Sequence, residues 1–471
     1  MVKAFKNKKV LLMGLGLHGG ALAVATWLLK QGADLTITDV KTEEQLKSSL
    51  QKLSAFGGKK LKEKIKFSLG GHRLGDFIEQ DLIIQNPGVP KDSVYLNIAR
   101  QLNIPIVNEA VMFFGLYPGK KVAVTGTRGK STTATLIHQL LKTEIKNNVL
   151  AGNIATTPMF SVLDKIKKDA WPVLELSSWQ LENLDEYKQS PEIAIVTNVL
   201  VDHLNRYKNF NEYAKAKFAI TKWQTKNDSV ILNYDNKVTR AMAKKTQAKV
   251  YWFSLNKKVI RGAYVFAGDI YFTDGKKLEK IMPLNQLAIL GEHNLANVLA
   301  ALIVAKLLNI DNKNIIKVLK SFSGIDYRLQ YKGIVKGRAV YNDSTATTPD
   351  ATQAAIKALL PKKILLIAGG QDKVLDYKDL AKLIKAKVSY LILLSGTGSD
   401  KLIQELKKIN FPSTKLKANV PSLDAAWKLA LKYKNTDCIL FSPAAASFNM
   451  FLHEFDRAKQ FNKLVNDFQK K

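Results

Sequence analysis

The sequence predicts an α/β protein built of three domains. Its 471 residues correspond to about three domains of ordinary size. Short apolar runs rich in β-branched residues alternate with stretches of helical period along the whole chain, which is typical of helices packed on largely parallel sheets. Hydrophobic residues make up 46% of the chain, which is enough for several cores.

The first domain is expected over residues 1–118. A glycine-rich segment, Gly115–Lys121, then predicts a linker, with Lys120 and Lys121 expected in solvent. The predicted elements of this domain are strands Val10–Met13, Leu35–Thr38, Leu82–Gln85 and Ile104–Val107 and helix Ala21–Lys30.

The second domain is expected over residues 119–324 and the third over 325–471. The second has predicted strands Lys121–Thr125, Val173–Leu176 and Ile193–Thr197 and a β-rich stretch at Val250–Phe272. The third has predicted strands Ala339–Tyr341, Ile364–Ile367, Tyr390–Leu394 and Cys438–Phe441, separated by predicted helices Ala351–Leu360, Tyr377–Lys387 and Leu423–Lys434.

Charge and cysteine content narrow the class of protein. The net charge of +32 suggests binding to nucleic acid or to a membrane surface. However, the lysines are spread along the chain, without an Arg-rich tail or zinc-finger spacing. We therefore favour a solvated lysine-rich surface and expect no nucleic-acid partner. The single cysteine, Cys438, excludes a disulfide framework and favours a reducing compartment. No apolar run reaches 18 residues, so we expect a cytoplasmic protein without a membrane span.

The strongest motif is the segment Val122–Thr132, VAVTGTRGKST. An apolar strand ends in a glycine turn, and Lys130 and Ser131 then open a predicted helix. Glycines let backbone N–H groups surround phosphate oxygens, a lysine reaches the β- and γ-phosphates, and a hydroxyl binds Mg²⁺. Val124 stands where the longer form of this motif has its first glycine, so a chance turn remains the alternative to an ATP site.

A second glycine motif, Gly14-x-Gly16-x-x-Gly19, lies near the N-terminus. It follows a predicted strand, and Asp39 ends the next strand, where a ribose-binding acid lies in a dinucleotide fold. Alone, the motif favours NAD or a turn needed only for strand–helix packing. A nucleotide-linked substrate bound here and ATP bound in the second domain would account for both motifs.

Further polar groups follow apolar strands, where open α/β sheets bind ligands. Glu175 is placed to bind Mg²⁺, and His203 beside Asp202 is a metal ligand, a proton carrier or a structural side chain. Lys217, from its helical spacing alone, is a surface lysine. In the third domain the segments at 342–349, 369–373 and 442–448 suit a carboxylate-bearing substrate, although each alone is compatible with helix capping.

These elements together resemble the Mur ligases, and within that family the branch that adds glutamate. The matching segments occur in order over nearly the whole chain: TGTRGKSTT, LELSSWQLE, TNVLVDHLNRY, GEHNLANVLAA, YRLQ, NDSTAT, GGQDK and LFSPAAASF. The resemblance implies a Rossmann-like UDP-binding domain, a P-loop ATPase-like central domain and a Rossmann-like C-terminal domain. It implies a monomeric, Mg²⁺-requiring enzyme that uses ATP to join glutamate, with the D form favoured, to UDP-N-acetylmuramoyl-L-alanine through an acyl phosphate.

The resemblance also assigns roles to residues of this sequence. The UDP-linked substrate is assigned Leu17, His18, Asp39, Lys41, Asn153, Ser177 and Gln180. ATP is assigned Gly126, Thr127, Arg128, Gly129, Lys130, Ser131, Thr132, Asn294, Asn297, Arg328 and Asp343. The metal is assigned Ser131, Glu175, His203 and Lys217, the last as a carbamylated lysine, which reverses the surface interpretation. Lys130, Glu175, His203 and Lys217 are the implied catalytic set, and glutamate is assigned Thr347, Lys373 and Ser447.

Some residues depart from the family pattern. Arg128 stands where the family usually has Asn, and Thr345 replaces a common lysine. The segment around His453–Phe455 also differs, so an L-glutamate-adding variant or another Mur ligase remains an alternative. From other classes, an NAD-dependent oxidoreductase or a basic nucleic-acid-binding ATPase is the competing hypothesis, whereas the N-terminal glycine motif argues against a folylpolyglutamate synthase-like enzyme.

Overall fold

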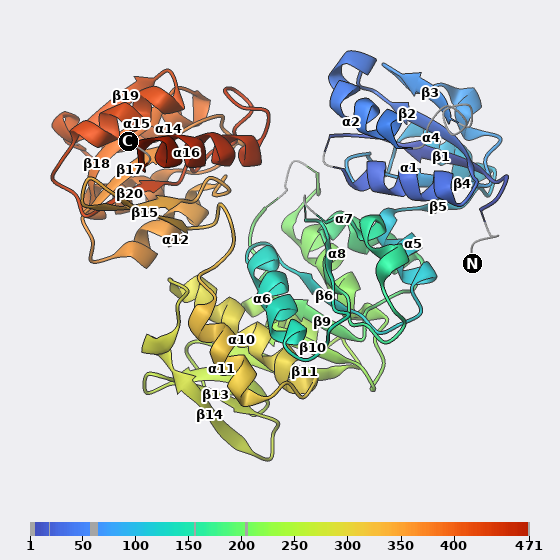
Figure 1. Cartoon of the computed structure of the whole chain (residues 1–471), viewed down its shortest axis with the longest axis horizontal. Coiled ribbons are helices and arrows are strands. Elements are labelled where there is room, and N and C mark those ends of the chain that lie inside the picture. The colour runs from blue at the N-terminus through green and yellow to red at the C-terminus, as the bar shows by residue number, and fades with distance from the viewer. Residues whose placement is uncertain (1–4, 18, 57–64, 155–156, 203–205, 470–471) are drawn as a thin grey trace. The chain divides into compact units, whose positions relative to one another are not determined.

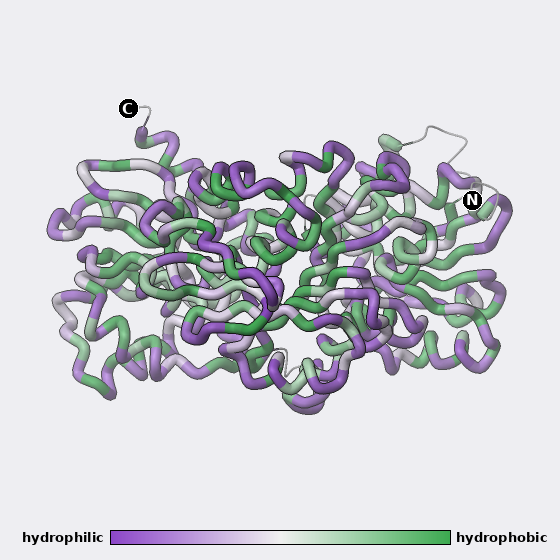
Figure 2. The backbone as a smooth tube through the Cα atoms, turned by 90° about the horizontal axis from the view of Figure 1, so that it is seen from below, coloured by the Kyte–Doolittle hydropathy of each residue, from purple (hydrophilic) through white to green (hydrophobic). Residues whose placement is uncertain are grey.

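The computed structural model describes residues 5–17, 19–56, 65–154, 157–202 and 206–469, and these form three sheets with flanking helices (Figure 1). The chain divides into two compact units. The first comprises residues 1–286 and 296–318, and the second comprises residues 287–295 and 319–471. Along the backbone, hydrophobic stretches alternate with hydrophilic ones throughout the chain, as the sequence pattern predicts (Figure 2).

The first sheet has five parallel strands in the order β3-β2-β1-β4-β5. Alternate residues of β1 enter different cores: Val10 and Leu12 pack with α1, whereas Leu11 and Met13 pack with α4. A sheet covered on both faces requires apolar residues at successive positions, which is why β1 is a continuous apolar run. The elements are β1 Lys9–Met13, α1 Gly20–Lys30, β2 Asp34–Asp39, α2 Glu43–Ala55, β3 Ile65–Leu69, η1 Leu74–Phe77, β4 Leu82–Gln85, α4 Val94–Gln101, β5 Ile106–Val107 and α5 Glu109–Leu116.

The second sheet has nine strands in the order β14-β13-β12-β11-β10-β9-β6-β8-β7. It is parallel from β7 to β12, and β12, β13 and β14 form an antiparallel meander at one edge. Its strands are β6 Val122–Thr125, β7 Leu150–Gly152, β8 Val173–Glu175, β9 Ile193–Val196, β10 Ser229–Asn233, β11 Lys249–Ser254, β12 Gly262–Phe266, β13 Asp269–Thr273 and β14 Leu278–Pro283. The helices of this part of the chain are α6 Lys130–Lys142, η2 Met159–Ser161, η3 Leu163–Lys165, α7 Ser178–Glu186, α8 Phe210–Lys222, α9 Lys237–Ala243, η4 Leu284–Gln286, α10 Glu292–Leu307 and α11 Asn312–Ser321.

The third sheet has six strands in the order β15-β16-β20-β17-β18-β19, and β15 is its antiparallel edge strand. Leu366 of β17 lies in a core with α12, α13 and α14, whereas its neighbours Leu365 and Ile367 lie in a core with α15 and α16. The elements are β15 Gln330–Val335, β16 Arg338–Asn342, α12 Pro349–Leu359, β17 Ile364–Ala368, α13 Lys378–Lys387, β18 Val388–Leu394, α14 Thr397–Lys408, η5 Ser413–Lys415, β19 Leu416–Val420, α15 Leu423–Lys432, β20 Cys438–Phe441 and α16 Glu454–Gln469.

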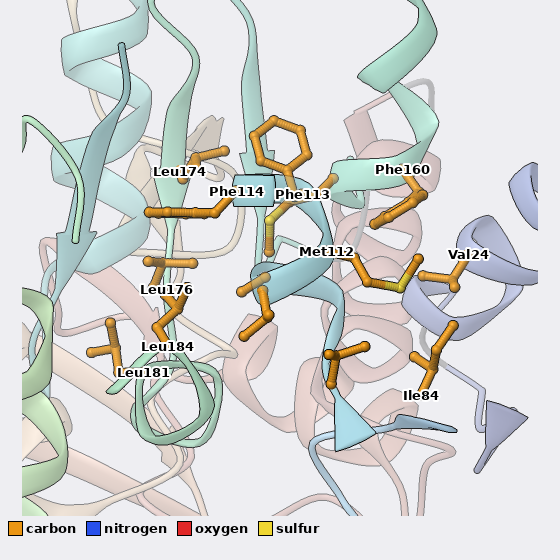
Figure 3. Packing of buried hydrophobic residues seen from close by; sticks show 14 of the residues in the cluster. Val24, Ile84, Met112, Phe113, Phe114, Phe160, Leu174, Leu176, Leu181 and Leu184 are labelled. Carbon is orange, nitrogen blue, oxygen red and sulfur yellow. The ribbon is translucent and has the colours of Figure 1, made fainter. Parts of the chain in front are cut away.

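Helix α5 joins the first two sheets into one unit. Figure 3 shows Met112, Phe113 and Phe114 of this helix in a single apolar cluster that also holds Val24 of α1 and Leu174 of β8. Asn108 caps the helix by accepting the Val111 N–H at 3.0 Å. Because the helix and its cap are buried, this junction belongs to the hydrophobic core of the unit and is not a solvated hinge.

One prediction about the linker is wrong. Lys120 is exposed as predicted, but Lys121 is only 6% exposed. Its Nζ donates to the Gly119 carbonyl and lies 5.3 Å from the Phe114 ring centre and 5.5 Å from the Tyr117 ring centre. Aromatic faces stabilise the buried ammonium, so the lysine packs where solvent was expected.

Candidate active site

Two glycines shape the loop between β6 and α6. Gly126 has φ +146° and Gly129 has φ +85°, a region that favours residues without a side chain. A Cβ on Gly126 would lie 1.9 Å from Thr197 Oγ1, and one on Gly129 would lie 2.3 Å from Asn297 Oδ1. The loop therefore turns tightly into the N-terminus of α6, where backbone N–H groups and the helix dipole favour an anion.

The end of β9 holds this loop in place. Asn198 Oδ1 accepts the Arg128 N–H at 3.0 Å, and Thr197 Oγ1 donates to the Arg128 carbonyl at 2.6 Å. The Thr127 N–H donates to the Asn198 carbonyl at 2.9 Å. The sequence motif TNVLVDH contains Thr197 and Asn198 but predicts no role for either, and their position after an apolar strand is the signal that could have marked them.

Two lysines meet at one carbonyl of the loop. Lys130 Nζ donates to the carbonyls of Gly126 at 3.1 Å and Thr127 at 3.2 Å, and Lys217 Nζ donates to the same Gly126 carbonyl at 2.9 Å. Lys217 is 2% exposed and its ammonium lies 4.7 Å from the centre of the Tyr213 ring. Burial holds the pKa of Lys217 well below its usual value, and the charge of Lys130 lowers it further. The surface interpretation of Lys217 from its helical spacing is wrong.

Glu175 ends β8 beside the loop, because Val124 of β6 pairs with it across the sheet. Its side chain is buried, and Oε1 accepts from Asn153 Nδ2 at 3.3 Å. The other oxygen, Oε2, is buried without a hydrogen-bond partner in the described part of the chain. A buried carboxylate oxygen in this state costs free energy unless a cation or donor approaches it, so Glu175 fits a metal ligand.

The structure says less about the other predicted metal ligands. Ser131 lies in the first turn of α6, next to Lys130. His203 lies outside the described residues. Within them, no group of three or more His, Cys, Asp or Glu side chains is arranged to hold a metal ion.

Ser177 and Gln180 form a reciprocal cap at the start of α7. The Gln180 N–H donates to Ser177 Oγ at 3.3 Å, and the Ser177 N–H donates to Gln180 Oε1 at 2.9 Å. This capping box satisfies backbone donors at the helix N-terminus. It also fixes both side chains beside Glu175, at the carboxyl end of β8.

The N-terminal glycine loop is held by Asp39. Its Oδ2 accepts the backbone N–H groups of Leu15 at 2.9 Å and Gly16 at 3.0 Å, and its Oδ1 accepts that of Lys41 at 2.9 Å. The carboxylate is 4% exposed, so much of its hydrogen-bonding capacity closes the loop. Leu17 is 50% exposed beside it, whereas His18 lies outside the described residues.

In the second unit, Asp343 lies at the end of β16. Its Oδ2 accepts from Ser442 Oγ at 2.7 Å and its Oδ1 accepts the Leu329 N–H at 3.0 Å. Burial raises the pKa of Asp343 to about 7, although the hydrogen bond from Ser442 and the charge of Arg328 oppose the rise. Asn294, in the same unit, donates through Nδ2 to the Leu290 carbonyl at 2.7 Å.

The residues predicted to bind the glutamate substrate, Thr347, Lys373 and Ser447, lie on connected loops of this unit. Lys373 Nζ donates to Thr347 Oγ1 at 3.2 Å. Gln371 and Ala446 form an antiparallel bridge, which joins the loop of Lys373 to the loop of Ser447. The Ser447 hydroxyl is buried without a hydrogen-bond partner among the described residues.

A buried arginine of α16 supports these loops and was missed in the sequence. Arg457 Nε donates to Ser344 Oγ at 3.1 Å, Nη2 to the Ser344 carbonyl at 2.7 Å and Nη1 to the Ala445 carbonyl at 3.1 Å. Burial lowers the pKa of Arg457 to about 10. Nothing in the helical spacing of Glu454–Gln469 marks this arginine as different from a surface cation.

Fold and site together define an α/β nucleotide-binding enzyme with a phosphate loop in its middle domain. Family models match in order along the chain: the Mur ligase MurD-like N-terminal domain at residues 8–108, the Mur ligase middle domain at 124–305, and the Mur ligase glutamate ligase domain at 327–445. The chain therefore belongs to the Mur ligase family, and it is an ATP-dependent ligase.

Relatives of known name match over nearly the full length. The chain is 37% identical over 463 residues to the UDP-N-acetylmuramoylalanine–D-glutamate ligase of Koribacter versatilis, covering 98% of this chain and 97% of the relative. It is 35% identical over 473 residues to the enzyme of that name from Borreliella afzelii, covering 98% of each.

Solved structures confirm the three-domain fold. UDP-N-acetylmuramate–alanine ligase of Thermotoga maritima matches with a TM-score of 0.62 at 20% identity, covering 98% of this chain and 100% of that one. The MurF ligase of the same organism in complex with ADP matches with a TM-score of 0.59 at 18% identity, covering 100% of this chain and 97% of that one. None of the helices in the described part of the chain combines the length and apolar character that a membrane span requires.

Proposed function

We propose that this ligase joins D-glutamate to the L-alanine carboxylate of UDP-N-acetylmuramoyl-L-alanine during peptidoglycan synthesis. The names of relatives that match almost the whole chain support the choice of substrates. The structural observation that carries the proposal is the pair of lysines at the Gly126 carbonyl, with Lys130 in the phosphate loop and Lys217 buried behind it. This arrangement suits the activation of a carboxylate by phosphoryl transfer.

The proposed reaction has two steps. A carboxylate oxygen of the substrate attacks the γ-phosphorus, the bond from that phosphorus to the β–γ bridging oxygen breaks, and ADP leaves. The glutamate nitrogen then attacks the carbonyl carbon of the acyl phosphate, phosphate leaves with the C–O bonding electrons, and the nitrogen loses its proton. The enzyme contributes mainly positioning and neutralisation of charge, so a serine or cysteine nucleophile is not needed.

The phosphate loop supplies the positive charge for the first step. Backbone N–H groups of Gly129–Thr132 surround the phosphates, since those of Thr127 and Arg128 are bonded to Asn198, and the Lys130 ammonium moves from loop carbonyls to phosphate oxygens. Exchanging carbonyl dipoles for full negative charges strengthens the contacts of the ammonium as charge develops on the leaving oxygen.

Among the described residues, Glu175 and Ser131 would hold a Mg²⁺ ion, and the family resemblance adds His203, which lies outside the described residues. The buried, unpartnered Glu175 Oε2 is the observation that favours a cation there. When bound, Mg²⁺ would polarise the phosphate oxygens and neutralise part of their charge. Asn153 orients the carboxylate by donating to its other oxygen.

Lys217 is proposed as a carbamylated lysine. Its amine is buried, makes no ion pair within the described residues, and lies close to the ammonium of Lys130. A second ammonium in this place repels the first, whereas a carbamate, formed when the neutral amine attacks CO₂ and loses a proton, converts repulsion into attraction. The lowered pKa supports the neutral amine that this reaction needs.

The remaining residues are proposed as substrate contacts. Leu17, His18, Asp39 and Lys41 serve the uridine diphosphate, with Asp39 acting through the loop it closes. Asn153, Ser177 and Gln180 serve the muramoyl group, and Asn294, Asn297, Arg328 and Asp343 serve the adenosine and phosphates of ATP. Lys373, Thr347 and Ser447 serve glutamate, whose carboxylates suit an ammonium and two hydroxyls.

We further propose domain boundaries at 118/119 and 324/325 and a cytoplasmic location, where ATP and nucleotide-linked precursors are available. The linker prediction at Gly115–Lys121 supports the first boundary, since α5 ends at Leu116 and β6 begins at Val122. A size measurement on the purified chain tests the expectation of a monomer.

The decisive experiment supplies UDP-N-acetylmuramoyl-L-alanine and Mg·ATP with D-glutamate, L-glutamate or L-alanine in separate reactions. We expect phosphate release and a new amide product with D-glutamate. The Lys130→Ala variant should lose nearly all turnover while its circular dichroism stays unchanged, and Lys142→Ala, at the other end of α6, is the control. Phosphate release that no amino acid stimulates would refute the ligase reaction, and a preference for L-glutamate would refute the stereochemistry alone.

A further inference from the structure

Arg128 occupies an unusual place in the phosphate loop. Its backbone and its side chain have separate partners. The backbone N–H and carbonyl are bonded to Asn198 and Thr197 at the end of β9. The side chain instead reaches Asp202, with Nη1 3.0 Å from Oδ2.

The bonds from Arg128 to Asn198 and Thr197 use its backbone atoms, so these bonds do not depend on its side chain. Any residue at this position can make them. The loop also has its two obligatory glycines on either side of Arg128. The bonds to β9 and the two glycines therefore do not account for the guanidinium.

In the ion pair between Arg128 and Asp202, another anion can take the place of the Asp202 carboxylate. The Arg128 side chain is 31% exposed and that of Asp202 is 19% exposed, so water screens their attraction. A guanidinium binds phosphate through two parallel hydrogen bonds, and a nucleotide polyphosphate carries several charges where Asp202 carries one. The competition favours the polyphosphate once it occupies the loop.

The charges around the loop support this exchange. Lys217 lies within the electrostatic reach of Lys130, Arg128, Asp202 and Glu175, so these groups form one cluster around the Gly126–Lys130 turn. Asp202 balances part of the positive charge in this cluster. A polyphosphate brings its own negative charge and makes that balance unnecessary.

We propose that Arg128 is a further ligand of the nucleotide's terminal phosphates, and that Asp202 is a positioning residue that holds the guanidinium beside the loop and gives it up to the polyphosphate. The inference rests on the proposed function, since it assumes that ATP binds this loop. It adds an exchangeable cation to the fixed Lys130, at a position where the resemblance leads one to expect an uncharged amide.

The test measures binding of ATP, ADP and AMP to the full chain by calorimetry without Mg²⁺, so that the metal site does not enter. We expect Arg128→Asn to weaken ATP and ADP binding about tenfold or more, the loss of one charge-assisted contact, and to leave AMP binding within about twofold. Arg128→Lys should recover part of the loss. Arg240→Asn replaces an arginine of α9 whose side chain bonds the Tyr234 carbonyl, and it should match the unmodified chain.

The role of Asp202 is read from a double-mutant comparison. Asp202→Asn should tighten ADP binding in the unmodified chain because it frees the guanidinium, and the gain should be smaller in the Arg128→Asn background. Equal gains in ADP affinity in both backgrounds would mean that Asp202 only repels the phosphates, and this result would overturn the proposed exchange.

Failure of this inference is distinguishable from failure of the proposed function. If the unmodified chain binds ATP in a Lys130-dependent manner but Arg128→Asn changes nothing, Arg128 is no phosphate ligand and the ligase assignment stands. Equal weakening of ATP and AMP would also overturn the proposal, because it would indicate a damaged loop. If the unmodified chain binds no nucleotide at all, both proposals fall.

Discussion

The buried carboxyl of Glu109 makes the stability of the first unit depend on pH. Glu109 begins α5, and its Oε1 accepts the Met159 N–H at 2.8 Å. Burial raises its pKa from 4.5 to about 7, and the hydrogen bonds from Met159 and Phe160 oppose the rise only in part. No salt bridge to Glu109 occurs within the described residues.

The sign of the effect follows from proton binding. Between pH 4.5 and about 7 the folded state holds a proton on Glu109 that the unfolded chain has released, so the free energy of unfolding falls as pH rises through this window. Each pKa unit corresponds to about 1.4 kcal/mol, which gives a total cost of about 3 kcal/mol for ionising the folded state. Of this, about 2.5 kcal/mol should be lost between pH 5 and pH 8.

The perturbation is Glu109→Gln, which keeps the side-chain shape and one acceptor but cannot ionise. We expect the difference in the free energy of unfolding, variant minus unmodified chain, to rise by about 2.5 kcal/mol from pH 5 to pH 8, measured by urea unfolding followed by tryptophan fluorescence. Asp343 also titrates near pH 7, but it is present in both proteins and cancels in the difference. Exposed Glu44 of α2 provides the control variant Glu44→Gln. Parallel stability curves for Glu109→Gln and the unmodified chain would refute the reasoning.

Two further predictions concern the active site. Lys217→Ala should reduce turnover by orders of magnitude, and short carboxylates such as formate or acetate should restore part of it by taking the place of the carbamate; full activity without them would reject the carbamate. Gly129→Ala forces an alanine into φ +85°, at a cost of about 1–2 kcal/mol, and places its Cβ 2.3 Å from Asn297 Oδ1. ADP binding measured by calorimetry should weaken about tenfold or more. Equal affinities of Gly129→Ala and the unmodified chain would show that the turn tolerates a side chain.

The parallel core of each sheet was predictable because its strands are continuous apolar runs. Burial on both faces removes the alternation that marks an exposed strand, and β4 and β20 were placed from this signal alone. The edge strands β3 and β15 carry no such run. β3 has the sequence IKFSL with exposed positions at its middle, and β15 contains a glycine and two polar residues, so neither stands out from a loop.

The position of the phosphate loop was predictable for a different reason. Its glycines, lysine and hydroxyl are adjacent in sequence, so the chemistry and the turn are encoded in one segment. The groups that hold it come from elsewhere in the chain. Thr197 and Asn198 lie 69 and 70 residues from Arg128 along the chain, and sequence spacing cannot show which strand end lies beside the loop.

Lys217 and Arg457 show why other residues of the candidate sites could not be recognised from sequence spacing. On α8 and α16 their spacing is that of a partly exposed face, and cations at such positions are ordinarily solvated. Both are buried because a loop from another part of the fold covers them and offers carbonyl oxygens: Gly126 for Lys217, and Ser344 with Ala445 for Arg457. A buried amine or guanidinium is costly unless its N–H groups find acceptors, so each of these side chains marks a place where the fold accepts a cost to fix a loop. In both units the fixed loop is one that the sequence motifs associate with substrate, and the buried basic side chain behind it supports the same two candidate sites.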